Sequence, residues 1–309
     1  MSQARSSTVS RGWPASAIVP LLLLGIIALY ALSWVWSAQV LMTAPPLWSA
    51  AIRLAASLGA ILALNAVRRR SGRDASRLAL PRILVLSLLG FAGFFGLTYL
   101  ALADIPASLL VLVLSTIPIL TLLQGRVLFG MRLGPFSMVG ILCICAAIWL
   151  FAQLVDPVSG SDPLLGIVFG LVAAAGYSFY GLLYKKWAGS VMVTDLLPWL
   201  LAPSAIAIAL LAFHLEGAPR IVMADIAALA VIGALIAAPI YVMYNALILR
   251  AGPLAASSIS VAAPITTFIL ESLMIRHQAL GVSAFALVLI GAVGVALLAL
   301  DGQRKDLRT

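Results

Sequence analysis

Charged side chains are scarce in this sequence of 309 residues. Asp, Glu, Lys and Arg together make up 9% of the chain, whereas a soluble globular domain carries about 25%. Apolar residues account for 63% of the chain, and the mean hydropathy is +1.15. This composition excludes an ordinary soluble domain and indicates a protein that is solvated by lipid.

Cysteine and histidine are also rare, with two residues of each. Cys143 and Cys145 are two positions apart in one apolar run, so they lie on roughly opposite faces of a helix, where they suit neither a disulfide nor a metal site. The chain has no HExxH, no paired aspartates in an apolar run and no GxxxxGK[ST]. We therefore expect no metal, no cofactor and no catalytic residue, which disfavours a membrane hydrolase, a metalloprotease and an ATP-driven pump.

The net charge of +9 does not indicate nucleic acid as a partner. The basic residues flank apolar runs instead of gathering on one face, so they are better explained by membrane topology. The partners that we expect are the lipid bilayer and a small-molecule substrate, with the protein a monomer or a weak homodimer.

Apolar runs long enough to cross a bilayer recur along the whole chain. A span needs about 20 apolar residues, and ten segments meet this criterion in two groups of five, with the halves at 1–154 and 155–309. The sequence therefore predicts an all-α polytopic membrane protein. The ten predicted spans are Ala17–Ala38, Leu47–Val67, Ile83–Ala103, Pro106–Leu123, Pro135–Leu154, Pro163–Tyr184, Val191–His214, Ile221–Leu249, Pro253–Ile275 and Gly281–Leu300.

The basic residues predict the orientation of these spans. If the N-terminus is cytoplasmic, all but three of the 19 Lys and Arg residues fall in cytoplasmic segments. The exceptions are Arg53 within a span and Arg220 and Arg276 outside. The positive-inside rule then places both termini in the cytoplasm. We expect the protein to reside in the bacterial inner membrane.

The two halves contain a weak internal repeat. Residues 97–102 (LTYLAL) match residues 242–247 (VMYNAL), and each segment leads through a tight joint with a proline into a span with a second, central proline. Because each half has an odd number of spans, the halves must insert with opposite orientation. Inverted repeats of this kind are typical of secondary transporters with a site at the membrane midplane.

A polar stripe runs along the predicted ninth span, where Ser257, Ser260, Pro264, Thr267 and Glu271 share one helix face. The fourth span repeats the pattern with Ser108, Ser115 and Pro118. A proline inside a helix removes one backbone hydrogen bond and frees a carbonyl. We expect both stripes to face a central substrate cavity.

Arg53 and Glu271 are the two ionisable residues that clearly lie inside predicted spans, and both are close to the outer side. Buried charges in membranes usually face a cavity or a partner. One interpretation is an outer ion pair that acts as a gate or in coupling, with Glu271 able to meet a substrate ammonium or a proton. The alternative is that Glu271 pairs with Arg276 or snorkels, and that Arg53 ties carbonyls together.

Aromatic and amide side chains form two further groups. Trp34, Trp36 and Tyr99 fall in the outer half of their spans, whereas Tyr177, Tyr180, Tyr184, Tyr241, Tyr244 and Asn245 fall in the inner half. The sequence predicts two aromatic collars that stack a planar or apolar solute. The alternative is an interfacial belt that faces lipid, which applies most to Trp34 and Tyr184.

These features together resemble the EamA-type members of the drug/metabolite transporter superfamily. The resemblance rests on a Trp late in the first span (Ser33-Trp34-Val35-Trp36), Arg53 after Pro46, the ALADIPAS joint into the Pro118 span with its echo at Pro264, and glycines at 140, 291 and 294. It implies that spans 1–4 and 6–9 ring a cavity, with spans 5 and 10 outside the ring. Length and layout are most similar to bacterial amino-acid exporters, including the aromatic amino-acid branch.

The expected function is the export of a small metabolite, for which we favour apolar or aromatic amino acids, by alternating access with passive or weakly coupled transport. An alternative of the same fold is a nucleotide-sugar or other phosphorylated-solute carrier, which would need more basic residues in the cavity than Arg53. A membrane-embedded enzyme is the alternative of a different class, and it lacks converging catalytic groups. The predicted cavity residues are Trp36, Tyr99, Ser115, Pro118, Tyr177, Tyr180, Tyr241, Tyr244, Asn245, Ser257, Ser260 and Pro264, with Arg53 and Glu271 as gate or coupling residues.

Overall fold

The computed structural model describes residues 15–68, 78–129, 135–154, 162–189, 191–257, 263–276 and 282–306, and within these ranges the chain is helical without strands. The all-α class predicted from the sequence is therefore confirmed. The elements are α1 (Ala15–Val40), α2 (Pro46–Val67), α3 (Leu80–Ser87), η2 (Leu88–Ala92), α4 (Gly93–Asp104), α5 (Ala107–Leu114), α6 (Ile117–Phe129), α7 (Pro135–Leu154), α8 (Pro163–Trp187), α9 (Val193–Glu216), α10 (Met223–Val231), η3 (Ile232–Ala237), α11 (Ala238–Ala251), α12 (Pro253–Ser257), α13 (Ala263–Glu271), η5 (Ser272–Arg276) and α14 (Val282–Asp306).

Six of the ten predicted spans are helices that are long and apolar enough to cross a membrane. They are Pro46–Val67, Leu80–Asp104, Ala107–Leu128, Pro163–Trp187, Val193–Glu216 and Met223–Ala251. The other four predicted spans coincide with shorter apolar helices at Gly25–Val40, Met138–Leu154, Ala263–Met274 and Val282–Gly294 within the described ranges. The chain is therefore a multi-pass membrane protein, whereas the number of ten crossings stays a prediction.

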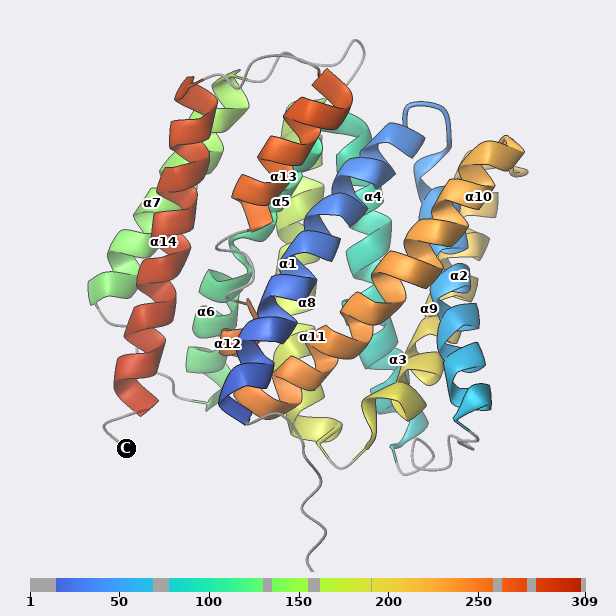
Figure 1. Cartoon of the computed structure of the whole chain (residues 1–309), viewed down its shortest axis with the longest axis horizontal. Helices are drawn as coiled ribbons and strands as arrows, with labels where there is room; N and C mark the ends of the chain where they lie inside the picture. Colours follow the sequence, from blue (N-terminus) through green and yellow to red (C-terminus); the bar gives the residue numbers. More distant parts are fainter. Residues whose placement is uncertain are drawn as a thin grey trace, which may run out of the picture.

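The start of α1 and the end of α14 lie at the same end of the molecule (Figure 1). This end also receives the end of α2 and the start of α3, and we call it the terminal end. The pair α3–α4 runs away from the terminal end, and the pair α10–α11 runs towards it (Figure 1). α5–α6 and α12–α13 are likewise antiparallel to one another (Figure 1). Corresponding helices of the two halves thus run in opposite directions.

Two of the long helices contain a π-helical segment at corresponding places. η2 separates α3 from α4, and η3 separates α10 from α11. A π segment has one extra residue per turn and often marks a functional position. Both segments contain a glycine in a close contact, because a Cβ on Gly90 would lie 2.4 Å from the Tyr180 ring and a Cβ on Gly233 would lie 2.4 Å from the Arg53 carbonyl oxygen.

The fourth predicted span differs from a continuous helix with a central proline. The fourth is interrupted by a turn at Ser115 and Thr116, and Pro118 is the second residue of the new helix α6. Pro264 is likewise the second residue of α13, after α12 has ended at Ser257. The physical reason is that proline has no N–H to donate, which costs nothing in the first turn of a helix and much in its interior.

Carboxylates from one helix satisfy the N-terminal N–H groups of another at the end opposite the termini. α2 and α5 each follow a proline, Pro45 and Pro106, that offers no capping side chain. Glu216 at the end of α9 accepts hydrogen bonds from the backbone N–H groups of Leu47 (2.8 Å) and Trp48 (3.1 Å). Because first-turn N–H groups have no partner within their own helix, such a carboxylate both satisfies them and interacts favourably with the helix dipole.

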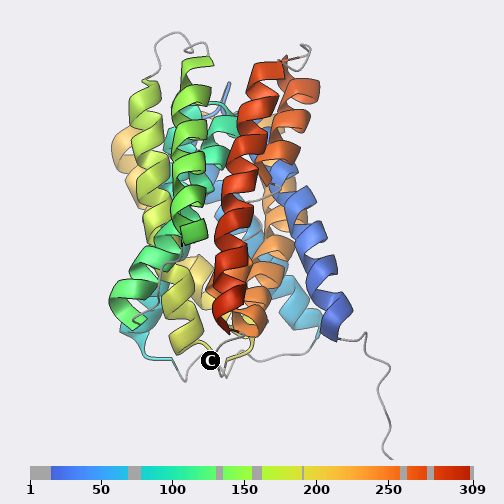
Figure 2. The same cartoon turned by 90° about the vertical axis from the view of Figure 1, so that its left-hand side faces the viewer.

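α7 and α14 lie side by side along one side of the molecule, as both views show (Figures 1 and 2). Their contact is close, because a Cβ on Gly294 would lie 2.7 Å from the carbonyl oxygen of Gly140. Small residues allow helix backbones to approach in this way in membranes. The other long helices surround the aromatic cluster that is described next.

Candidate functional site

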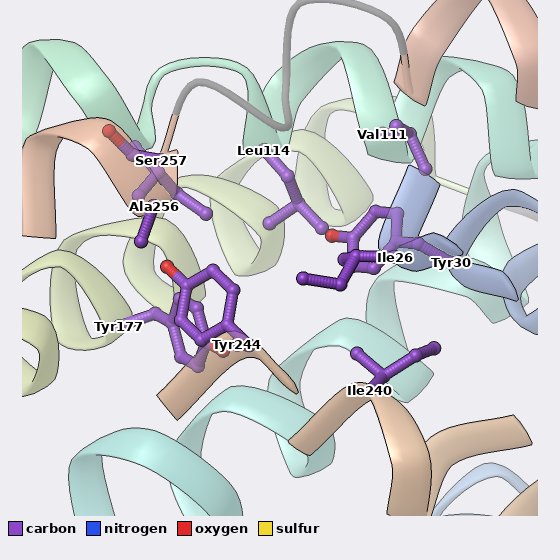
Figure 3. Close-up of a pocket in the computed structure, with 10 residues that line it drawn as sticks. Ile26, Tyr30, Val111, Leu114, Tyr177, Ile240, Tyr244, Ala256 and Ser257 are labelled. Atoms are coloured by element: carbon purple, nitrogen blue, oxygen red, sulfur yellow. The ribbon is translucent and has the colours of Figure 1, made fainter. Parts of the chain in front are cut away.

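A small cavity lies in the middle of the bundle between α1, α5, α6, α8, α11 and α12. Its volume is about 40 Å³, which is space for only a few water molecules, since one water requires about 10–15 Å³. Tyr30 enters it from one side, and Tyr177 and Tyr244 enter it from the other (Figure 3). The lining is completed by Ile26, Val111, Leu114, Ile117, Ile240, Ala256 and Ser257. It contains no charged side chain and is mainly apolar.

The aromatic residues form one continuous cluster. The Tyr30 ring contacts Trp34 at 5.7 Å between centroids, and Phe95 contacts Tyr241 at 5.5 Å. At the other end, Tyr177 lies 5.3 Å from Tyr244. The prediction of two separate collars therefore has to be modified, because phenylalanines from the η2–α4 region connect them. These residues are Phe91, Phe94 and Phe95.

Arg53 lies inside this cluster with 2% of its surface exposed. Its guanidinium carbon is 4.8 Å from the Phe95 ring centre and 5.3 Å from that of Trp34. Its Nη1 donates hydrogen bonds to the hydroxyl of Tyr99 at 3.2 Å and to that of Ser37 at 3.4 Å, whereas its Nε has no hydrogen-bond partner within the described chain. The partners of Arg53 are thus aromatic faces and hydroxyl groups, and neither Glu271 nor a carbonyl is among them.

Glu271 is also buried, with 4% of its surface exposed. Its Oε2 accepts a hydrogen bond of 2.8 Å from the backbone N–H of Ser108 in the first turn of α5. Glu271 therefore caps the N-terminus of α5, as Glu216 caps that of α2. This hydrogen bond connects α13 of the second half to α5 of the first. The predicted ion pair with Arg53 is not formed in this conformation. The side chain of Arg276, the other partner that the sequence offered, lies outside the described residues.

Tyr180, Tyr241 and Asn245 belong to the wall of the cluster rather than to the lining of the cavity. The Tyr180 hydroxyl donates a 2.5 Å hydrogen bond to Oδ1 of Asn245, and Nδ2 of Asn245 donates to the carbonyl of Tyr241 at 2.8 Å. The bond from Tyr180 connects α8 to α11, whereas the bond to the Tyr241 carbonyl lies within α11. The hydroxyl of Tyr241 is buried without a hydrogen-bond partner among the described residues.

The remaining predicted cavity residues fall into three groups. Tyr177, Tyr244 and Ser257 line the cavity. Tyr99 is buried beside Arg53 in the aromatic cluster, and Trp36 is half-buried against the hydrophobic core. Ser115 lies at the break of the fourth span, and Pro118 and Pro264 are buried at the second position of α6 and of α13. Ser260 lies outside the described residues.

Four members of the cluster were not among the predicted cavity residues, namely Tyr30, Phe91, Phe94 and Phe95. Tyr30 precedes Trp34 by four positions, a spacing that places both on one helix face. The phenylalanines occur in the segment GFAGFFG, where alternation with glycine indicates close packing. These spacings were visible in the sequence, but the contact with Arg53 depends on how α1, α2 and α4 pack together.

Comparisons with known proteins agree with this architecture. A solved crystal structure is similar to the chain with a TM-score of 0.69 and 20% sequence identity, over 94% of this chain and 100% of the other. At that identity the likeness shows the fold alone. A search of curated proteins gave no match.

The first half of the chain carries the evidence for a family. Residues 17–153 match the model of the EamA-like transporter family, whose members are membrane transporters of the drug/metabolite type rather than enzymes. This agrees with the features that the sequence analysis singled out around Trp34, Arg53 and Pro118. Over residues 17–153 the chain is therefore similar to the EamA-like transporter family.

Proposed function

We propose that the protein exports amino acids with apolar or aromatic side chains across the bacterial inner membrane by alternating access. The observation that supports this most is the buried Arg53 guanidinium, which has no paired carboxylate within the described chain. Amino acids with apolar or aromatic side chains combine a carboxylate with an apolar body, and the buried guanidinium and the aromatic rings are counterparts of these two parts.

The charge of Arg53 is only partly compensated by the protein. Burial of an ion without a partner costs several kcal/mol, and a cation–π contact returns about 0.5–2 kcal/mol. The Nε of Arg53 has no hydrogen-bond partner among the described residues, so hydrogen-bonding capacity is left unused. A carboxylate that approaches this end of the cluster would gain both a charge partner and hydrogen bonds, and even at about 10 Å the attraction amounts to about 1–2 kcal/mol in an effective dielectric of about 20.

The cavity supplies the apolar half of the binding site. Tyr30 lines the cavity and contacts Trp34, and the Trp34 ring in turn contacts Arg53. The cavity and the guanidinium, which are the two parts of the proposed site, are therefore connected through the Trp34 ring. The cavity volume of about 40 Å³ is too small for an amino acid. Transport therefore requires a second conformation in which the cluster separates, and we infer that Trp34 and Tyr30 move when the substrate enters.

Coupling to a proton gradient is not required by this arrangement. Glu271, the carboxylate that the sequence suggested for coupling, holds the first turn of α5. We propose passive or weakly coupled transport in the outward direction, with the termini in the cytoplasm as the distribution of basic residues predicts.

Counterflow in proteoliposomes tests this proposal. Vesicles preloaded with each unlabelled amino acid are given the same labelled compound, and UDP-glucose serves as the control for the phosphorylated-solute alternative. We expect counterflow for phenylalanine, tyrosine, leucine or methionine and none for UDP-glucose. Counterflow of the nucleotide sugar alone, or no counterflow for any amino acid, would refute the proposed substrate class.

A further inference from the structure

A second and larger cavity opens on the side of the molecule between α2, α3 and α9. Its volume is about 700 Å³, within the range of small-molecule binding sites. Side chains with large exposed fractions form its walls, including Leu62 (49%), Trp199 (48%) and Ile206 (62%). Because the helices cross a membrane, these walls are in contact with hydrocarbon, and the groove is open to lipid.

The polar end of this groove offers hydrogen-bond acceptors. Asn65 and Asp195 line the groove with 7% and 8% of their surfaces exposed, and Oδ1 of each has no hydrogen-bond partner among the described residues. Nδ2 of Asn65 donates to the carbonyl of Thr194 at 2.8 Å, so the amide oxygen is left as the available atom. Buried acceptors without a donor are costly, especially in a membrane.

Two further features restrict what can satisfy these acceptors. Asp195, in the first turn of α9, contributes a carboxylate whose Oδ1 has no hydrogen-bond partner among the described residues, so the site favours a ligand that donates hydrogen bonds and carries positive charge. Arg68 is exposed and follows Asn65 by three positions at the end of α2, so α2 carries a positive charge about one turn beyond Asn65. This charge pattern is complementary to a zwitterion with an ammonium group inside and a phosphate outside.

We propose that the groove binds a phospholipid whose headgroup carries a primary ammonium. The ammonium donates to Asp195 and to Oδ1 of Asn65, the phosphate lies near Arg68, and an acyl chain lies along Leu62, Trp199 and Ile206. A trimethylated headgroup has no N–H to donate, and an anionic headgroup meets the carboxylate unfavourably. The site is separate from the proposed substrate site, because it lies on the lipid-facing side of α2 whereas Arg53 faces the aromatic cluster.

Native mass spectrometry of the protein from nanodiscs with equal amounts of phosphatidylethanolamine, phosphatidylcholine and phosphatidylglycerol tests this inference. For the wild type we expect retention of phosphatidylethanolamine to exceed that of the other two lipids roughly tenfold, which corresponds to about 1.4 kcal/mol. Asp195→Asn should reduce this preference to about twofold or less, because the amide carries no charge for the ammonium.

Two other variants make the result specific. Ala202→Trp fills the groove without touching its polar groups, so it should lower the retention of the bound lipid. Asp225→Asn is the control: it removes a carboxylate at the end of the molecule opposite the terminal end, where Oδ2 of Asp225 accepts a hydrogen bond from Thr43. It should leave the preference for phosphatidylethanolamine unchanged. Size-exclusion profiles establish that each variant is folded. Equal retention of the three lipids by the wild type, or an unchanged preference in folded Asp195→Asn, would overturn the proposal.

Discussion

At the scale of single residues, Arg53 and Glu271 have different roles although both are charged and buried. Arg53 lies among aromatic rings and hydroxyl groups without a counter-charge in the described chain. Glu271 has its partner in the backbone N–H of Ser108, which would otherwise be an unsatisfied group at the start of α5. The sequence identified both residues as important but not their partners, because these come from helices distant in the chain.

The role of Glu271 as a cap predicts how its variants differ. Glu271→Ala should lower the free energy of unfolding by about 1–2 kcal/mol, as for other lost caps, whereas Glu271→Gln retains an acceptor and should cost much less. The measurement is thermal unfolding in detergent, with counterflow and its pH dependence as second readouts. If Gln and Ala destabilise the protein equally, or if Gln abolishes the pH dependence of transport, the capping role is wrong.

At the scale of elements, the positions of helices followed from the long apolar runs, and α7 has the predicted boundaries at Pro135 and Leu154. The break in the fourth span, at Ser115 and Thr116, could not be predicted from the apolar runs. Pro118 lies in the first turn of a new helix, α6, instead of loosening the interior of a continuous one. The π segments η2 and η3 were not predicted, because nothing in a local apolar run indicates one extra residue per turn.

The close contact between η3 and α2 predicts a large effect of a single methyl group. A Cβ on Gly233 would meet the Arg53 carbonyl oxygen at 2.4 Å, and a backbone atom cannot move aside as a flexible side chain can. Gly233→Ala should therefore destabilise the protein by about 1–3 kcal/mol, as overpacking does in other cores.

Gly59 provides the matched control for this change, because it lies in α2 and a Cβ there would meet nothing within 4 Å. Gly59→Ala should be neutral or stabilise the protein by up to about 1 kcal/mol, since alanine favours a helix more than glycine does. Both variants are compared by thermal unfolding. Equal melting temperatures for the two variants would contradict the packing that we describe for η3 against α2.

At the scale of the whole molecule, corresponding helices of the two halves run in opposite directions (Figure 1). The start of α1 and the end of α14 lie at one end, as an even number of crossings requires. The sequence indicated this arrangement through the odd number of spans per half and the positions of the basic residues. It could not indicate the volume of the central cavity, which depends on the conformation.

Reporter fusions test the orientation. Green fluorescent protein fused after residue 309 should be fluorescent, and alkaline phosphatase at the same position should be inactive, because both results follow from a cytoplasmic C-terminus. The matched control is a fusion truncated after Gly217, between α9 and α10, where the reporters should behave in the opposite way. Active phosphatase at the C-terminus would reverse the proposed direction of every span.

The most direct test of the proposed substrate class is competition in the counterflow of labelled phenylalanine. Phenethylamine has the same ring and ammonium group but no carboxylate, so it should not compete in the wild type, whereas unlabelled phenylalanine should. In Arg53→Gln the affinity for phenylalanine should fall at least about tenfold, or about 1.4 kcal/mol. In Arg53→Lys, which keeps the charge but not the planar guanidinium, the affinity should fall less. If phenethylamine competes as well as phenylalanine, or if folded Arg53→Gln transports with unchanged affinity, Arg53 does not recognise a substrate carboxylate.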